Sequence, residues 1–189
     1  MSEHMALENL TVLDLTRVLA GPFCTMMLAD MGANVIKIEV PKGGDDTRSY
    51  PPFRAKNLNG ERESVYFANI NRNKKGITLN LKAPEGKEIF KELVKKADIV
   101  VENYRPGVMD KLGLGYDVLK EINPRIIYAA VSGFGCYGPY HLRPGYDILA
   151  QAMGGMMSIT GSKGGEPTRA GSALGDILGG LHVTIGILA

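Results

Sequence analysis

The stretch TVLDLTRVLAGPFCTMMLADMGANVIKI, residues 11–38, decides the fold. It opens with a short apolar run, Thr11 to Leu15, that is typical of a buried strand. Apolar residues then recur at helical spacing from Ala20 to Met31, and Gly32 supplies a helix stop. A second apolar run, Asn34 to Ile38, follows almost at once. The pattern predicts strand, helix, strand, which is the unit from which parallel sheets are built.

The same alternation continues along the chain. Further strands are predicted over residues 76–81, 98–101 and 126–131. Between them Pro84 opens an amphipathic helix, and a shorter helix is predicted over 116–122. Strands that alternate with helices in this way predict an α/β protein whose parallel sheet carries helices on both faces.

Two stretches interrupt this regularity. Residues 41–62 are polar and contain Pro and Gly, and they are long for a connection in a compact fold. They are expected to form a surface loop with a binding or subunit-contact role, or a plain solvated insertion. The glycine-rich residues 154–165 are a second candidate mobile segment.

Composition argues against several classes of protein. The 22 Lys and Arg nearly balance the 20 Asp and Glu, so nothing points to a nucleic-acid partner. Charged residues stand where a signal peptide would begin, and the final apolar run is too short to span a bilayer. We therefore expect a cytoplasmic protein without a membrane partner. The cysteines and histidines lack the spacing of a disulfide framework or a metal site: Cys24, Cys136, His4, His141 and His182.

Glycine-rich phosphate loops are also absent. The turn over residues 16–22, where a dinucleotide-binding fold would place its spaced glycines, contains one glycine and a proline. Gly113-Leu114-Gly115 is not followed by the remaining glycine, and the sequence contains no P-loop.

Asp176 is the candidate catalytic residue. It lies between Gly175 and the pair Gly179-Gly180, at the head of an apolar helical pattern that runs to Ala189. Glycines let a bulky substrate approach, and a helix N-terminus favours the ionised carboxylate, so the setting suits a nucleophile. The competing interpretation is an ordinary helix N-cap. The pattern stops at Ala189 without a capping residue, which predicts that a longer polypeptide has been truncated here.

Several ordered motifs resemble one family, the class III CoA transferases, also called the CaiB/BaiF family. The resemblance runs from about Leu7 to Ala189. The motifs that carry it are VLDLTR over 12–17 with AGP over 20–22, GANVIKIE over 32–39, NKK over 73–75 with LNLK over 79–82, VENYRPG over 101–107, and LGD over 174–176.

The resemblance implies a Rossmann-like fold, with residues 1–189 forming the N-terminal part of the large CoA-binding and catalytic domain of an interlocked homodimer. It implies that the small domain and the returning C-terminal segment lie outside this chain. The implied substrates are an acyl-CoA and a carboxylic acid, with no tightly bound cofactor. Asp176 would attack the thioester, forming an aspartyl anhydride and then an aspartyl-CoA thioester.

The resemblance also assigns contacts to coenzyme A. The residues that match the family's CoA cleft are Arg17, Val18, Ala20, Leu79, Lys82, Asn103, Tyr104 and Lys111. Amides near Gly179 and Gly180 are expected to help stabilise oxyanions. Val40 replaces an arginine that the formyl-CoA branch places at the nucleotide end, so Arg48 or Lys42 is expected to supply that charge.

Two alternatives stay open. An α-methylacyl-CoA racemase shares the implied fold but carries Gly-His-Asp where this chain has Gly145-Tyr146-Asp147, and tyrosine is a poor exchange base at neutral pH. The chain could also be a non-catalytic CoA-binding fragment. The acyl group is not set by the sequence, and succinyl-CoA is the default donor only because it is common in the family.

Overall fold

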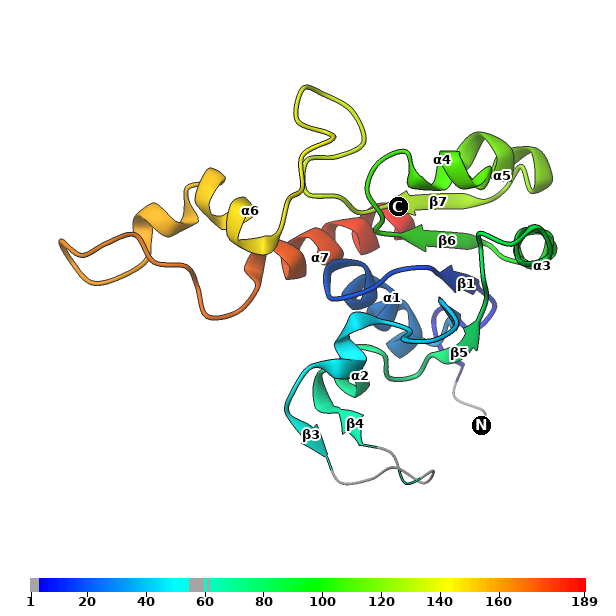
Figure 1. Ribbon diagram of the computed structural model, residues 1–189, viewed down its shortest axis with the longest axis horizontal. Coiled ribbons are helices and arrows are strands. Elements are labelled where there is room, and N and C mark those ends of the chain that lie inside the picture. Colours follow the sequence, from blue (N-terminus) through cyan, green and yellow to red (C-terminus); the bar gives the residue numbers. More distant parts are fainter. Residues whose placement is uncertain (1–3, 55–59, 61) are drawn as a thin grey trace.

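A parallel five-stranded sheet forms the centre of the computed structural model, which describes residues 4–54, 60 and 62–189 (Figure 1). The strand order is β5-β2-β1-β6-β7, and every neighbouring pair is parallel. The strands are β1 (Thr11–Asp14), β2 (Asn34–Glu39), β5 (Lys75–Thr78), β6 (Ile99–Glu102) and β7 (Ile127–Ala130). The predicted α/β fold is thus confirmed, although β5 ends at Thr78 rather than at residue 81.

Helices cover both faces of the sheet, as the alternating pattern predicts. On one face lie α1 (Ala20–Asp30) and α7 (Leu174–Leu188), and on the other α3 (Pro84–Val94), α4 (Val108–Leu112) and α5 (Tyr116–Ile122). Successive β1 residues serve the two cores, since Val12 packs with α1 and Leu13 packs with α3. Both side chains are buried, which explains the near-continuous apolar character of the strand.

Helices α1 and α7 pack directly against each other beside the sheet (Figure 1). Gly180 of α7 faces the start of α1, where a Cβ atom would overlap the carbonyl oxygen of Ala20. Glycine at this position lets the two helices approach closely. The crossing therefore fixes α7, one turn beyond Asp176, against the first residue of α1.

The polar stretch over 41–62 is not a plain solvated insertion in its first part. Asp45 and Thr47 are buried, and Asp45 caps a short 3-10 helix, η1 (Asp46–Ser49). Beyond it β3 (Phe53–Arg54) pairs with β4 (Glu63–Ser64), which leads into α2 (Val65–Ile70). The sequence prediction over residues 55–59 and 61 lies outside the described residues.

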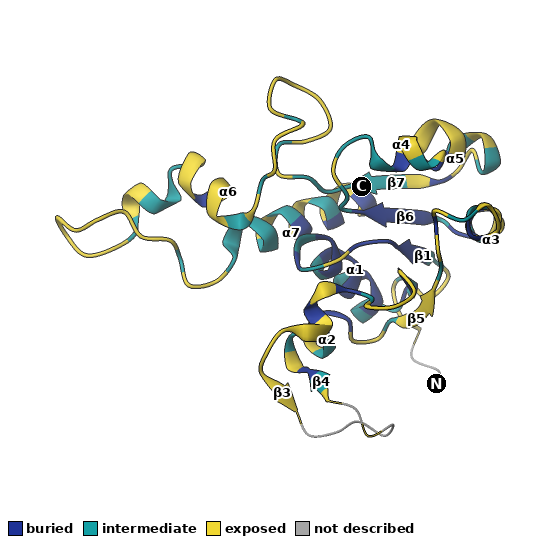
Figure 2. Cartoon of the chain, viewed as in Figure 1, coloured by how far each residue is buried: buried dark blue, intermediate teal, exposed yellow. Residues whose placement is uncertain are grey.

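An arm extends from the sheet between β7 and α7 (Figures 1 and 2). It contains α6 (Asp147–Met153), a second 3-10 helix η2 (Met156–Ile159) and the glycine-rich residues 154–165. Large apolar side chains are exposed along it, including Tyr137, Leu142 and Ile159. Among the residues that the structure describes, no helix has the length and apolar character needed to cross a bilayer.

Candidate active site

The turns that follow β1 and β6 meet at the carboxyl edge of the sheet, where the strand order reverses. Open α/β sheets bind ligands at such a reversal. The Arg17 N–H donates to Asn103 Oδ1 at 2.9 Å, and Asn103 Nδ2 donates to the Arg17 carbonyl at 2.7 Å. The two turns, both of which the sequence assigned to the CoA cleft, are therefore joined by a pair of hydrogen bonds.

A small hollow of about 40 Å³ opens beside this junction. It is lined by Leu15, Thr16, Arg17, Ile38, Glu39, Val40, Gly44, Asp45 and Tyr104. Of the predicted CoA contacts, Arg17 and Tyr104 lie in this lining. The lining combines Arg17 and the Tyr104 ring with the carboxylates of Glu39 and Asp45, which are paired with Arg48 and Lys37.

The other predicted contacts occupy different places. Val18 and Ala20 follow Arg17 in the same turn and at the start of α1. Leu79 is partly buried against the core, and its N–H donates to the Glu39 carbonyl at 2.8 Å. Lys82 and Lys111 are exposed and do not line the hollow. Their assignment to CoA stays a prediction.

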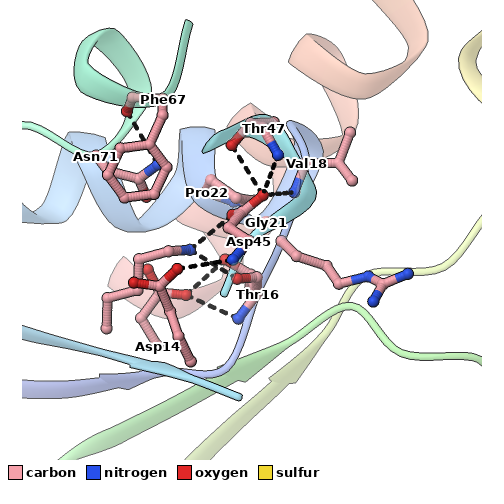
Figure 3. A network of polar contacts seen from close by, with 12 residues as sticks. Asp14, Thr16, Val18, Gly21, Pro22, Asp45, Thr47, Phe67 and Asn71 are labelled. Carbon is pink, nitrogen blue, oxygen red and sulfur yellow. Dashed lines mark hydrogen bonds and ion pairs between the residues drawn. The ribbon is translucent and has the colours of Figure 1, made fainter. Parts of the chain in front are cut away.

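A buried network of charged side chains supports the turn after β1 (Figure 3). The Asp14 carboxylate accepts from the Thr16 N–H at 2.9 Å, from the Thr25 hydroxyl at 2.7 Å and from Lys74 Nζ at 3.0 Å. Burial alone would raise the pKa of Asp14, but Lys74 and Lys37 outweigh it and hold the pKa below its usual value. Asp14 is thus a buried, ionised anchor.

A second ion pair lies beside the first. Lys37 Nζ donates to Asp45 Oδ2 at 2.9 Å and to the Thr16 carbonyl at 2.8 Å, and both charged side chains are buried. The other oxygen of Asp45 accepts from the Val18 N–H at 3.2 Å and from the Thr47 hydroxyl at 2.8 Å. Sequence reasoning missed this pair. The signal in the sequence was Lys37, a lysine at an inward position of the otherwise apolar strand β2.

Arg48, one of the two residues expected to supply the charge that Val40 lacks, is paired with Glu39. Its guanidinium forms two hydrogen bonds to Glu39, at 2.9 and 2.6 Å, and stacks 3.8 Å from the centre of the Phe67 ring. Burial would raise the pKa of Glu39, but the bonds from Arg48 and from the Asp45 amide lower it. The choice between Arg48 and Lys42 as the source of that charge stays a prediction.

Glu102 is a buried acid at the end of β6, directly before Asn103 and Tyr104. Its carboxylate accepts from the Tyr104 N–H at 2.7 Å and from the Tyr128 hydroxyl at 3.2 Å. Burial raises the pKa of Glu102 to about 7, despite these two bonds. A group that titrates near neutrality therefore shapes the turn that carries two predicted CoA contacts.

Asp176 is the third residue of α7 and is partly buried. It is not the N-cap, because the helix begins at Leu174 and the N-cap position is Ala173. Burial raises the pKa of Asp176, and the neighbouring Asp147 carboxylate raises it further. The expected preference of the helix N-terminus for the ionised form is thus outweighed.

Asp147 of α6 performs the capping that Ala173 cannot. One of its oxygens accepts from the Gly175 N–H at 2.8 Å, and the other accepts from Gln151 Nε2 at 2.8 Å. Gln151 is buried and also accepts from the Ala170 N–H at 2.8 Å. In the sequence Asp147 stands out only as part of the triplet Gly145-Tyr146-Asp147, whereas in the fold it holds the start of the Asp176 helix.

Tyr66 of α2 is another residue that the sequence analysis missed. Burial raises the pKa of the Tyr66 phenol, and the negative charge of Asp176 raises it further. Tyr66 lies on a short helix that no motif indicated.

The amides of Gly179 and Gly180 are not available as oxyanion donors. Both residues lie inside α7, where each N–H bonds to the carbonyl four residues earlier. The expectation of oxyanion donors near Gly179 and Gly180 stays a prediction, which these two amides themselves do not support.

The cysteines and histidines form no metal site in the part of the chain that the structure describes. No group of three or more His, Cys, Asp or Glu side chains there could hold a metal ion. Cys24 is buried, which raises the pKa of its thiol to about 11, and Cys136 is exposed.

Comparisons with known proteins agree with the motifs. A model of the family described as CoA-transferase family III matches residues 7–189. Human succinyl-CoA:glutarate CoA-transferase is 48% identical over all of this chain and 42% of its own length. Acetyl-CoA:oxalate CoA-transferase of Acetobacter aceti is 50% identical over 95% of this chain and 45% of its own length. The crystal structure of a CaiB/BaiF family protein from Brucella suis matches with a TM-score of 0.94 and 45% identity, covering 98% of this chain and 49% of that one. The chain thus spans less than half the length of each of these relatives.

Proposed function

Because the chain belongs to CoA-transferase family III, we propose that it moves coenzyme A from an acyl-CoA thioester to a carboxylic acid, with Asp176 as the nucleophile. The observation that carries the proposal is the setting of Asp176. Its partly buried carboxylate lies at the head of a helix that Asp147 caps and Gly180 fixes against α1. A partly buried carboxylate of raised pKa is a more basic nucleophile than an ordinary surface acid.

The proposed reaction has four displacements. A carboxylate oxygen of Asp176 attacks the thioester carbonyl carbon, and the C–S bond breaks to give a mixed anhydride and CoA thiolate. The thiolate attacks the aspartyl carbonyl, forming an aspartyl-CoA thioester and releasing the donor acid. The acceptor carboxylate displaces the thiolate to form a second anhydride. The thiolate then attacks the acceptor acyl carbon, which gives the new acyl-CoA and regenerates Asp176.

The predicted CoA contacts divide by chemistry. Arg17, Lys82 and Lys111 carry positive charge suited to phosphates, while Leu79 and Tyr104 offer apolar surface to the adenine or pantetheine. Backbone and amide groups of Val18, Ala20 and Asn103 complete the set. The double hydrogen bond between Arg17 and Asn103 supports a single cleft formed by both turns.

We also propose that residues 1–189 belong to the large domain of an interlocked homodimer that works in the cytoplasm. The outer side chains of α7 support this assembly, since Leu178, Leu181, Ile185 and Leu188 are each exposed in this chain. Complete burial of a Leu or Ile side chain contributes about 1.5–3 kcal/mol, and the exposed part of each of these four side chains forgoes a share of that. A partner subunit or a further segment would cover them.

The experiment is replacement of Asp176 in the complete protein. Asp176→Ala and Asp176→Asn should abolish CoA transfer and leave the calorimetric affinity for free CoA within about threefold of the wild type, because neither side chain can form the anhydride. Asp117→Asn is the matched control, since Asp117 is an exposed acid on α5. More than a few per cent of residual transfer by Asp176→Ala would exclude the nucleophile role.

A further inference from the structure

The carboxyl end of the sheet is charged on the face that packs against α1. Val12 and Val35 form part of the apolar core on this face. The next inward positions on the same strands are Asp14 and Lys37, which lie opposite each other in the β1–β2 register, and both are buried. Where β1 ends and the chain turns toward α1, the inward positions therefore hold the charged side chains of Asp14 and Lys37 instead of apolar ones.

These charges are directed at the backbone of the turn, residues 16–19. Asp14 binds the N–H of Thr16 and Lys37 binds its carbonyl. Asp45 binds the N–H of Val18 (Figure 3). With Asn103 bound to both backbone groups of Arg17, side chains from four separate segments hold consecutive peptide groups of one short turn.

The turn holds Val18 in a conformation that valine avoids. Its φ is +68°, in the left-handed region. For a β-branched residue this is a genuine outlier, with a cost of about 1–2 kcal/mol. A conformation of that cost persists only where surrounding contacts enforce it, and the contact to the Val18 N–H comes from Asp45.

We propose that the buried Lys37–Asp45 pair is a positioning device that holds the turn over residues 16–19, with Val18 left-handed, in the shape that binds coenzyme A. The proposal rests on the proposed function, because it assumes that Arg17 and its neighbours contact CoA. Lys37 and Asp45 act through the turn backbone. Their side chains are almost fully buried and reach it through the Thr16 carbonyl and the Val18 N–H.

Stability alone is a poor reason for this pair. Replacing a buried ion pair by neutral side chains of similar size is often neutral or stabilising, because desolvation offsets the attraction between the charges. Combining Lys37→Met with Asp45→Asn leaves neither charge of the pair without its partner. The side-chain amide introduced by Asp45→Asn can still accept from the Val18 N–H, but the link from Lys37 to the Thr16 carbonyl is lost.

The test measures the affinity of the complete protein for free CoA by calorimetry. The double variant K37M/D45N should fold, by circular dichroism, and bind CoA about tenfold more weakly. The turn then loses the Lys37 link to the Thr16 carbonyl, and the Val18 N–H keeps only a neutral acceptor, so Val18 can leave the left-handed region. Adding Val18→Gly should return the affinity to within about threefold of that of Val18→Gly alone, since glycine adopts positive φ without cost. Val18→Gly alone is the reference because Val18 is itself a predicted CoA contact.

A structural role without positioning gives a different result. In that case K37M/D45N would lower the melting temperature and leave CoA affinity unchanged, or Val18→Gly would fail to restore the affinity. The single variant Asp45→Asn keeps the Lys37 link to the Thr16 carbonyl, so it should weaken CoA binding less than K37M/D45N does. Unfolding of both variants would overturn the proposal too, because the pair would then maintain the fold rather than the turn. Failure of the wild type to bind CoA at all would instead refute the proposed function.

Discussion

Replacing Glu102 by glutamine should change how the stability of the protein depends on pH. Burial raises the pKa of Glu102 to about 7 from an ordinary value of 4.5. The folded state therefore binds this proton more tightly than the unfolded state does. Stability from this group is fully present below pH 4.5 and is lost as the pH rises to about 7 and above. The difference in pKa corresponds to about 3 kcal/mol.

The glutamine side chain in Glu102→Gln cannot ionise, so this variant does not lose stability from this group as the pH rises. Its amide can still accept from the Tyr104 N–H and can donate to the Tyr128 oxygen, so any change in these bonds is a constant offset. The free energy of unfolding of Glu102→Gln relative to the wild type should therefore rise by about 2–3 kcal/mol between pH 5 and pH 8.

The assay is denaturant unfolding of both proteins at the two pH values. Glu88→Gln is the matched control, because Glu88 forms an exposed pair with Lys91 and should show no such rise. An equal difference between Glu102→Gln and the wild type at pH 5 and pH 8 would refute the assignment of a raised pKa to this buried acid.

Two further predictions concern the helix that carries Asp176. Gly180→Ala places a methyl group against the Ala20 carbonyl and should lower the free energy of unfolding by about 1–3 kcal/mol, as measured by denaturant unfolding. Gly179→Ala is its control, since the position of its added Cβ is open, and an equal effect of both substitutions would contradict the close helix crossing. Burial and, after it, the Asp147 charge raise the pKa of Asp176. Asp147→Asn removes the second cause, so the acid limb of kcat/KM should move to lower pH. A limb that stays in place would show that Asp147 does not act on Asp176 through its charge.

The regular part of the fold could be predicted from the sequence because its signals are local. Thr11 to Asp14 and Asn34 to Glu39 form buried strands whose apolar residues identify them, and Pro84 opens α3 at the expected position. The short helices α2, α4 and α6 were missed, since five to seven residues give a weak periodic signal, although the seven-residue α5 was predicted over 116–122.

The contacts that shape the candidate site could not be predicted in the same way, because they join residues far apart in the chain. Asn103 meets Arg17 only once β6 lies beside β1. Asp147 caps the Asp176 helix from across the extended arm, and nothing near Gly175 indicates this. The turn at Val18 needs Asp45, which lies in a stretch whose polarity suggested only an exposed loop.

The most direct test of the central claim is to trap the covalent intermediate on the complete protein. Incubation with an acyl-CoA in the absence of an acceptor acid, followed by hydroxylamine, converts an aspartyl anhydride or thioester to a hydroxamate, whereas an ordinary carboxylate does not react. Peptide mapping by mass spectrometry should find the hydroxamate at Asp176 only, and only after exposure to acyl-CoA. A label at another residue, or none at Asp176 while transfer proceeds at its normal rate, would contradict the account.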